Sequence, residues 1–86
     1  MNGPEPLRVM VQDVWDEVRL PFEPARSVAE LKRQALAATR VRRDPDEYLV
    51  KFRGAELLDE AGSLADAGVI PNANLIILPR RRRPVR

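Results

Sequence analysis

The chain has 86 residues, enough for one small domain with a single hydrophobic core. It contains no cysteine and no histidine, which excludes disulfides, cysteine nucleophiles and histidine-based catalysis or metal binding. The formal net charge is +2, but residues 1–78 hold ten basic and thirteen acidic side chains and the other five basic side chains follow them. The body of the domain is therefore mildly acidic, and its basic character lies in the C-terminal segment.

Two alternating segments near the N-terminus predict a β-hairpin. In residues 7–12 every second residue is apolar, a pattern typical of a half-buried strand. After a turn expected at residues 13–17, which hold the polar pair Asp16-Glu17, the alternation resumes in residues 18–22. Because Pro21 cannot donate a hydrogen bond to a neighbouring strand, we expect this second strand at an edge of the sheet.

One long amphipathic helix is predicted next. Ser27 and Glu30 have the spacing of a capping box, in which each side chain accepts a backbone N–H at the start of the helix. The stripe expected to face the core comprises Val28, Leu31, Ala35 and Ala38. The solvent side is expected to hold Lys32, Arg33 and Gln34. The helix should end at Asp44-Pro45, because the residue before a proline disfavours helical backbone.

The second half of the chain predicts two strands, a single helical turn and a last strand. Residues 48–53 alternate, and Gly54 should turn the chain into a short return strand at 56–58. Ser63 begins a second capping-box pattern, whose one-turn helix should stop at the next glycine. The apolar run 75–78 suits a central strand. The order predicts an α+β fold in which one long helix packs across a mixed four- to five-stranded sheet, with the last strand beside the first.

Four segments of the chain resemble ubiquitin-like proteins. They are Glu23-Pro24, the stretch VAELK at 28–32, FRGAELLD at 52–59 and SLADAGV at 63–69. The resemblance covers about residues 7–78 and implies the ubiquitin-like β-grasp fold and a protein that acts by binding. Residues 63–78 are also similar to the bacterial YukD/EsaB-like family, whose members are small accessory proteins of type VII secretion systems. The layout is similar to the small β-grasp subunit of multicomponent aromatic monooxygenases.

Two departures from ubiquitin limit what the resemblance implies. Ubiquitin-type modifiers end in Gly-Gly, whereas here Leu78 is followed by PRRRRPVR, which contains no glycine. Ubiquitin also presents an apolar patch on the outer face of its sheet, and here Lys51 takes the place of the central apolar residue. Conjugation by the usual route and binding of ubiquitin's usual partners are therefore not expected.

The outer face of the sheet and the hairpin turn are the predicted protein-binding surface. Its residues are Leu49, Lys51, Ile76, Leu78, Val14 and Trp15. The apolar members would form an exposed patch for a partner; the alternative is that they are covered or scattered surface residues. The tryptophan is expected in the hairpin turn, either exposed as an anchor for a partner or folded back over the edge of the strand.

The C-terminal arginines are a second candidate site. They are Arg80, Arg81, Arg82, Arg83 and Arg86. This tail either contacts nucleic acid, an acidic protein surface or anionic lipid, or is a solvated segment without a partner. No aromatic residue lies among these arginines, so nucleic-acid binding should be weak and confined to the tail.

No catalytic, cofactor-binding or metal-binding residue is predicted. The acidic segment 44–47 lacks the spacing and the glycine of a calcium loop. Ser27 and Ser63 are already accounted for as helix caps, and no histidine can activate them. No stretch of the sequence is long and apolar enough to suggest a membrane span, and the N-terminus does not resemble a signal peptide.

The sequence therefore predicts a non-catalytic ubiquitin-like adaptor. We expect a small, cytoplasmic, monomeric accessory subunit of a larger bacterial system, with a protein partner and no small-molecule substrate. One alternative is a ubiquitin-like modifier precursor whose C-terminal tail is processed before conjugation. A second is weak nucleic-acid or ribosome association through the arginine tail. The expected organisation is a flexible lead-in at 1–6, the β-grasp domain at 7–78 and a disordered basic tail at 79–86.

Overall fold

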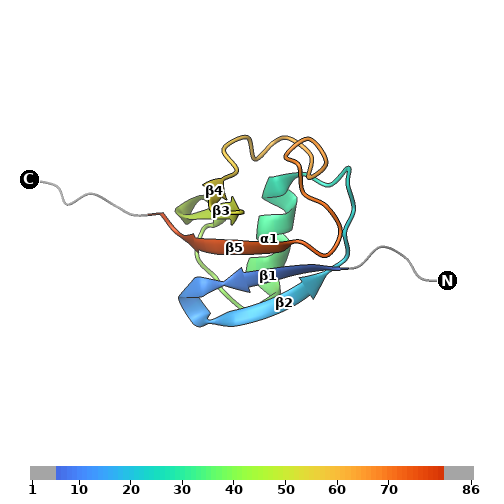
Figure 1. Ribbon diagram of the computed structural model, residues 1–86. Coiled ribbons are helices and arrows are strands. Elements are labelled where there is room, and N and C mark those ends of the chain that lie inside the picture. Colours follow the sequence, from blue (N-terminus) through green and yellow to red (C-terminus); the bar gives the residue numbers. More distant parts are fainter. Residues whose placement is uncertain (1–5, 81–86) are drawn as a thin grey trace, which may run out of the picture.

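The computed structural model describes residues 6–80. One helix, α1 (Val28–Ala38), packs across one face of a five-stranded sheet (Figure 1). The strands are β1 (Leu7–Val11), β2 (Asp16–Leu20), β3 (Tyr48–Phe52), β4 (Ala55–Glu56) and β5 (Asn74–Pro79). Two short 3₁₀ helices, η1 (Gln12–Val14) and η2 (Pro45–Glu47), precede β2 and β3.

The strand order is β2-β1-β5-β3-β4. β1 and β5 are parallel, whereas β1 and β2, β3 and β5, and β3 and β4 are antiparallel. The last strand is therefore central and beside the first, and β2 lies at an edge, as predicted. Pro21 falls one residue beyond the end of β2. The order and the two layers confirm the predicted α+β, ubiquitin-like β-grasp fold.

The core lies between α1 and the inner face of the sheet. Every second residue of β1 is buried, and β3 and β5 follow the same alternation except at their last residues, where Phe52 is half-buried and Pro79 is exposed. Each buried aliphatic side chain contributes roughly 1.5–3 kcal/mol when it is fully removed from water. The sheet supplies Leu7, Val9, Val11, Tyr48, Val50, Leu75 and Ile77, and the helix supplies Val28, Leu31, Ala35 and Leu36.

The hairpin turn overlaps the predicted segment 13–17 but begins and ends earlier. Asp16 and Glu17, the polar pair of the expected turn, are instead the first residues of β2. The turn is formed by η1 and by Trp15, whose backbone is left-handed at φ 52° and whose N–H donates to the Gln12 carbonyl at 3.2 Å. The polar pair misled the prediction because the pairing of Val11 with Asp16 across the strands decides where the loop begins.

The helix departs from the prediction in its buried stripe and in its end. Lys32, expected on the solvent side, is buried, whereas Ala38, expected in the core, is exposed. The helix ends at Ala38, well before Asp44-Pro45. Arg40 adopts φ 65°, and the N–H groups of Arg40 and Val41 donate to the carbonyls of residues 37 and 36. These two bonds form a Schellman motif, which closes the helix without a glycine.

The helix cap is half of the predicted capping box. The Ser27 hydroxyl accepts the Glu30 N–H at 3.1 Å, as expected. The Glu30 carboxylate instead pairs with Arg33 at 3.2 Å. Ser27 and Ser63 face each other in an isolated β-bridge, which is held by bonds from the Val28 N–H to the Gly62 carbonyl and from the Leu64 N–H to the Arg26 carbonyl.

The segment between β4 and β5 contains turns and not the predicted one-turn helix. The Ser63 hydroxyl does accept the Asp66 N–H at 3.0 Å, so the cap is formed. Gly68, at φ 86°, and the bond from the Val69 N–H to the Leu64 carbonyl end the turn before a regular helix develops. The return strand is Ala55–Glu56 and not 56–58.

Candidate protein-binding surface

Four of the predicted site residues lie together on the outer face of β3 and β5. Leu49 is opposite Leu78, and Lys51 is opposite Ile76. Their neighbours along both strands are buried against α1, so these four point away from the helix. Ile76 is 42% exposed, and the other three side chains are half-buried. We call these four residues the β3–β5 block.

A row of side chains extends this block across the whole sheet. Ile76 is next to Met10 of β1, and Met10 is opposite Glu17 of β2. On the other side Lys51 is opposite Glu56 of β4. The row is apolar at its centre and charged toward both edges. Met10 was not predicted from the sequence as part of this surface. The available signal was that Met10 alternates with the buried residues of β1 and therefore faces outward.

The predicted hairpin residues lie at one end of this block. η1 packs beside β5, and Figure 1 shows the hairpin turn on the same side of the molecule as the C-terminal end of β5. Val14 is 46% exposed and Trp15 is 75% exposed. The tryptophan is therefore not folded back over the strand. Its left-handed backbone is strained for a bulky side chain by roughly 1–2 kcal/mol.

Tyr48 links the hairpin turn to the core. Its ring is buried at the start of β3, and its hydroxyl donates to Asp13 Oδ2 at 2.7 Å. Burial raises the pKa of the Tyr48 hydroxyl above its ordinary value, and the hydrogen bond to the Asp13 carboxylate raises it further. The contact joins η1 to β3 across the end of β5, and it holds the exposed turn in place.

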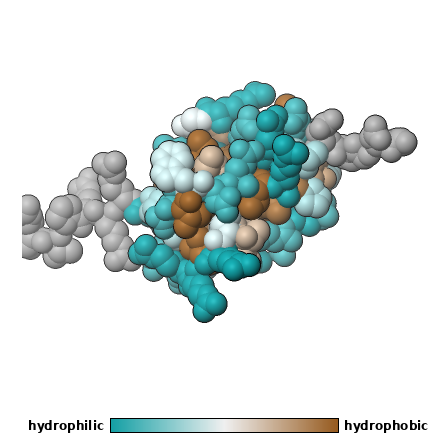
Figure 2. Space-filling view, turned by 90° about the horizontal axis from the view of Figure 1, so that it is seen from below, coloured by the Kyte–Doolittle hydropathy of each residue, from teal (hydrophilic) through white to brown (hydrophobic). Residues whose placement is uncertain are grey.

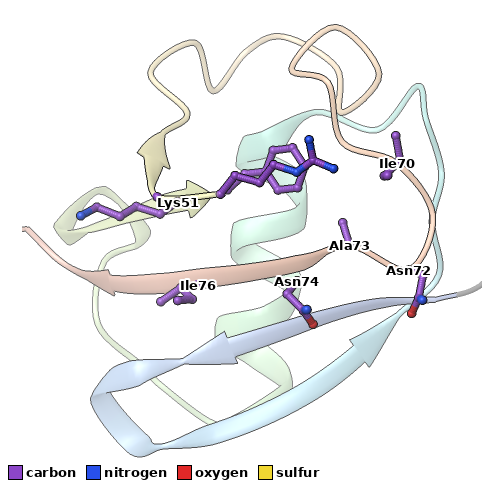
Figure 3. A pocket seen from close by; sticks show the side chains of 9 residues that line it. Lys51, Ile70, Asn72, Ala73, Asn74 and Ile76 are labelled. Atoms are coloured by element: carbon purple, nitrogen blue, oxygen red, sulfur yellow. The ribbon is translucent and has the colours of Figure 1, made fainter.

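A shallow depression of about 480 Å³ lies at the other end of the block. Figure 3 shows Ile76 and Asn74 on β5, Lys51 on β3, and Ile70 on the segment before β5. Ile70 is 50% exposed. Arg53, in the two-residue turn between β3 and β4, also lines the depression, and its guanidinium lies 5.1 Å from the centre of the Phe52 ring. Sequence reasoning missed this depression because Ile70 belongs to no periodic segment.

The apolar surface is divided into small areas. In Figure 2 the hydrophobic residues of one side form separate brown areas between hydrophilic teal ones. On the outer face the register groups Met10, Ile76, Leu78 and Leu49, and charged residues such as Lys51 and Glu17 border this group. A partner of this face must therefore match polar and charged groups as well as apolar ones.

Arg80 is attached to the body of the domain and is not part of a free tail. Its backbone N–H donates to the Glu47 carbonyl at 2.8 Å, and its Nε donates to the Asp46 carbonyl at 2.9 Å. Its guanidinium lies 3.3 Å from Glu56 and 3.6 Å from Glu60. Ordered structure thus continues two residues beyond the predicted domain end at Leu78. The predicted tail residues Arg81, Arg82, Arg83 and Arg86 lie outside the described residues.

A buried ion pair behind the sheet was not predicted. Lys32 is 1% exposed, and its Nζ donates to the Tyr48 carbonyl at 2.9 Å and to Glu60 Oε1 at 2.7 Å. A buried ammonium group requires such partners, because its desolvation is otherwise too costly. Glu60 Oε2 accepts no hydrogen bond, although Arg80 is near. The pair joins α1, β3 and the segment after β4.

Within residues 6–80, no group of three or more aspartates and glutamates lies close enough to hold a metal ion. In the same range, no helix has the length and apolar character needed to cross a membrane.

Comparison with known proteins relates the chain to others through its structure. Neither a protein-family model nor a curated protein matches the sequence. Among solved structures, ubiquitin from Caldiarchaeum subterraneum is 16% identical, with a TM-score of 0.74 over 95% of this chain and all of that one. The ubiquitin-like domain of an Arabidopsis thaliana protein is 12% identical, with a TM-score of 0.74 over 96% of this chain and 84% of that one. These likenesses and the sheet topology show that the chain has the ubiquitin-like β-grasp fold.

Proposed function

We propose that the chain is a non-catalytic, ubiquitin-like protein-binding module that acts as a small accessory subunit of a larger bacterial system. Its binding surface is the β3–β5 block together with the hairpin turn: Leu49, Lys51, Ile76, Leu78, Val14 and Trp15. The observation that carries the proposal is that the four residues of the β3–β5 block share the outer face of the sheet, that the hairpin turn lies at one end of this block, and that Val14, Trp15 and Ile76 are exposed.

Trp15 supplies the strongest argument for a partner. An exposed tryptophan on a rigid turn is the type of side chain that dominates binding energy in protein interfaces. Its backbone is left-handed, a strained conformation for a bulky residue, and strain of this kind persists where the surrounding structure enforces it. The hydrogen bond from Tyr48 to Asp13 supplies part of that enforcement.

The hydroxyl groups support a role without catalysis. Ser27 and Ser63 each accept a backbone N–H, so both serines serve to close local structure. The whole chain has no histidine or cysteine to act as a base or nucleophile at neutral pH. Function by contact is the role that these side chains best support.

Capture of proteins from a native bacterial lysate tests the proposal. The immobilised chain is compared with Trp15→Ala, Ile76→Ser and the matched control Leu58→Ser. Leu58 is 80% exposed but lies in the segment after β4, away from the proposed surface. We expect the first two variants to lose captured proteins that the control retains. Equal capture by all three variants would refute the surface, and a ladder of covalent adducts on a denaturing gel would instead indicate a conjugated modifier.

A further inference from the structure

The basic side chains of the described part fall into two groups. Five of them lie within 4.0 Å of a carboxylate: Arg26, Lys32, Arg33, Arg43 and Arg80. Six make no ion pair with an acidic residue in the range 6–80: Arg8, Arg19, Arg40, Arg42, Lys51 and Arg53. Four of these six belong to the sheet or to its β3–β4 turn: Arg8, Arg19, Lys51 and Arg53. Lys51 and Arg53 line the depression beside Ile76.

The register of the strands brings the unpaired cations of β1 and β2 together. Arg8 and Arg19 are directly opposite each other. Like charges in this arrangement destabilise a sheet by a few tenths of a kcal/mol to about 1 kcal/mol. Arg8 is also next to Asn74 of β5, and its guanidinium donates to Asn72 Oδ1 at 3.1 Å. Both asparagines line the depression, so Arg8 lies at its border.

Arg80 pairs with Glu56, the carboxylate that would otherwise be the partner of Lys51. Glu56 is opposite Lys51 across β3 and β4 and would be its nearest carboxylate. Glu56 instead pairs with the Arg80 guanidinium, and no ion pair between Glu56 and Lys51 forms. The charge of Lys51 is therefore available to a ligand, although the pairing of β3 with β4 places the acid Glu56 opposite it.

We propose that this surface binds an acidic peptide segment of a partner protein. An apolar side chain of the segment occupies the depression between Ile70 and Ile76. Carboxylates on either side of it are bound by Arg53 and Arg8 at one end and by Lys51 at the other. We call this surface the basic depression. The inference rests on the proposed function and adds to it the chemistry of the partner.

The distribution of charge favours a peptide over nucleic acid. Residues 6–80 hold eleven basic and twelve acidic side chains, so the body has no excess of positive charge to hold a long polyanion. The depression also exposes Ile70 and Ile76, which favours a ligand with an apolar side chain between its anionic groups. A short segment that combines both chemistries matches this surface, whereas a phosphate backbone matches only the cations.

Titration of the isotope-labelled full chain with synthetic peptides tests the inference. The probe is a twelve-residue peptide in which glutamates and aspartates flank leucine, and its control replaces the acids by their amides. We expect the acidic peptide to shift the amide resonances of Lys51, Arg53, Asn72 and Ile76, with a dissociation constant below about 1 mM. The amide control should bind at least tenfold more weakly. No shift at millimolar acidic peptide would overturn the inference.

Matched charge reversals locate the binding. Lys51→Glu with Arg53→Glu should weaken the acidic peptide about tenfold or more, because two attractions become repulsions. Arg40→Glu with Arg42→Glu is the control, since these cations are also unpaired and Arg40, like Arg53, has a left-handed backbone. Equal weakening by both pairs would mean general electrostatic attraction and would contradict a specific site.

Three further results would overturn the inference while leaving the proposed function intact. Equally tight binding of a twelve-nucleotide poly-dT strand would assign the cations to phosphate. Self-association that is abolished by Lys51→Glu would assign the surface to a second copy of the chain. If Trp15→Ala removes captured proteins but Lys51→Glu with Arg53→Glu does not, the chain binds proteins through the hairpin turn and only the present inference fails.

Discussion

The two lysines of the chain have opposite surroundings. Lys32 is buried behind the sheet, where it meets the Tyr48 carbonyl and Glu60. Lys51 lies on the outer face and pairs with no acid of the described part, although Glu56 is opposite it. Arg80 contacts both Glu60 and Glu56 and so affects both sites. The comparison shows that the role of each lysine depends on acids from other segments. A lysine that meets such an acid contributes to stability, and one that does not remains available for binding.

Removal of the buried charge should have the largest effect. Lys32→Met leaves Glu60 without its main partner, and we expect the free energy of unfolding to fall by about 3 kcal/mol. Lys51→Met should change it by less than about 0.5 kcal/mol. Urea denaturation measures both values. The double variant Lys32→Met, Glu60→Met should recover part of the loss, and similar losses for the two single lysine variants would contradict the contrast.

Alkaline pH should lower the free energy of unfolding through Tyr48, which lies in the same buried region as Lys32. The pKa of Tyr48 is raised in the folded state, so its hydroxyl loses a proton more readily when the chain is unfolded. The resulting stability is complete below the unfolded value of about 10 and is lost as the pH rises through the folded value. Urea midpoints measured from pH 8 to 11 should therefore decrease. Tyr48→Phe should cost about 1 kcal/mol at pH 8 through the lost bond to Asp13, and it should flatten the decrease if Tyr48 is its cause.

Arg80 connects the two lysine sites and should affect each of them modestly. Its side chain is partly exposed, so Arg80→Gln should lower the free energy of unfolding by about 0.5–1 kcal/mol. The same variant frees Glu56 to pair with Lys51, and we expect binding of the acidic peptide to the basic depression to weaken about twofold. Arg42→Gln is the control. Unchanged peptide binding by Arg80→Gln would show that Glu56 does not regulate Lys51.

An effect of similar size concerns the exposed hairpin turn. Trp15 has φ 52°, a conformation that glycine adopts without strain and alanine does not. Trp15→Gly should therefore be more stable than Trp15→Ala by about 1 kcal/mol, whereas neither variant should retain the captured partner. Thermal unfolding of the two variants gives the difference. A more stable alanine variant would mean that the turn relaxes to another backbone conformation when the indole is removed.

Much of the fold could be predicted because it depends on local periodicity. The alternation in β1, β3 and β5 places Val9, Val50 and Ile77 in the core, and the Ser27 cap begins α1 as expected. The same alternation puts the four residues of the β3–β5 block on the outer face. The missed parts of the candidate site, Met10, Ile70 and Arg53, become neighbours of that block only through the sheet register and the path of the segment before β5.

The sequence by itself determined the order of the elements, the parity of each strand and the type of side chain on each face. Those properties arise from contacts between residues a few positions apart. The tertiary structure alone decided that Lys32 is buried and Lys51 unpaired, that the hairpin turns at η1, and that Arg80 is attached to the body. Each of these depends on partners 24 to 34 positions away or on pairing across strands, and a single sequence contains no local signal for such distances.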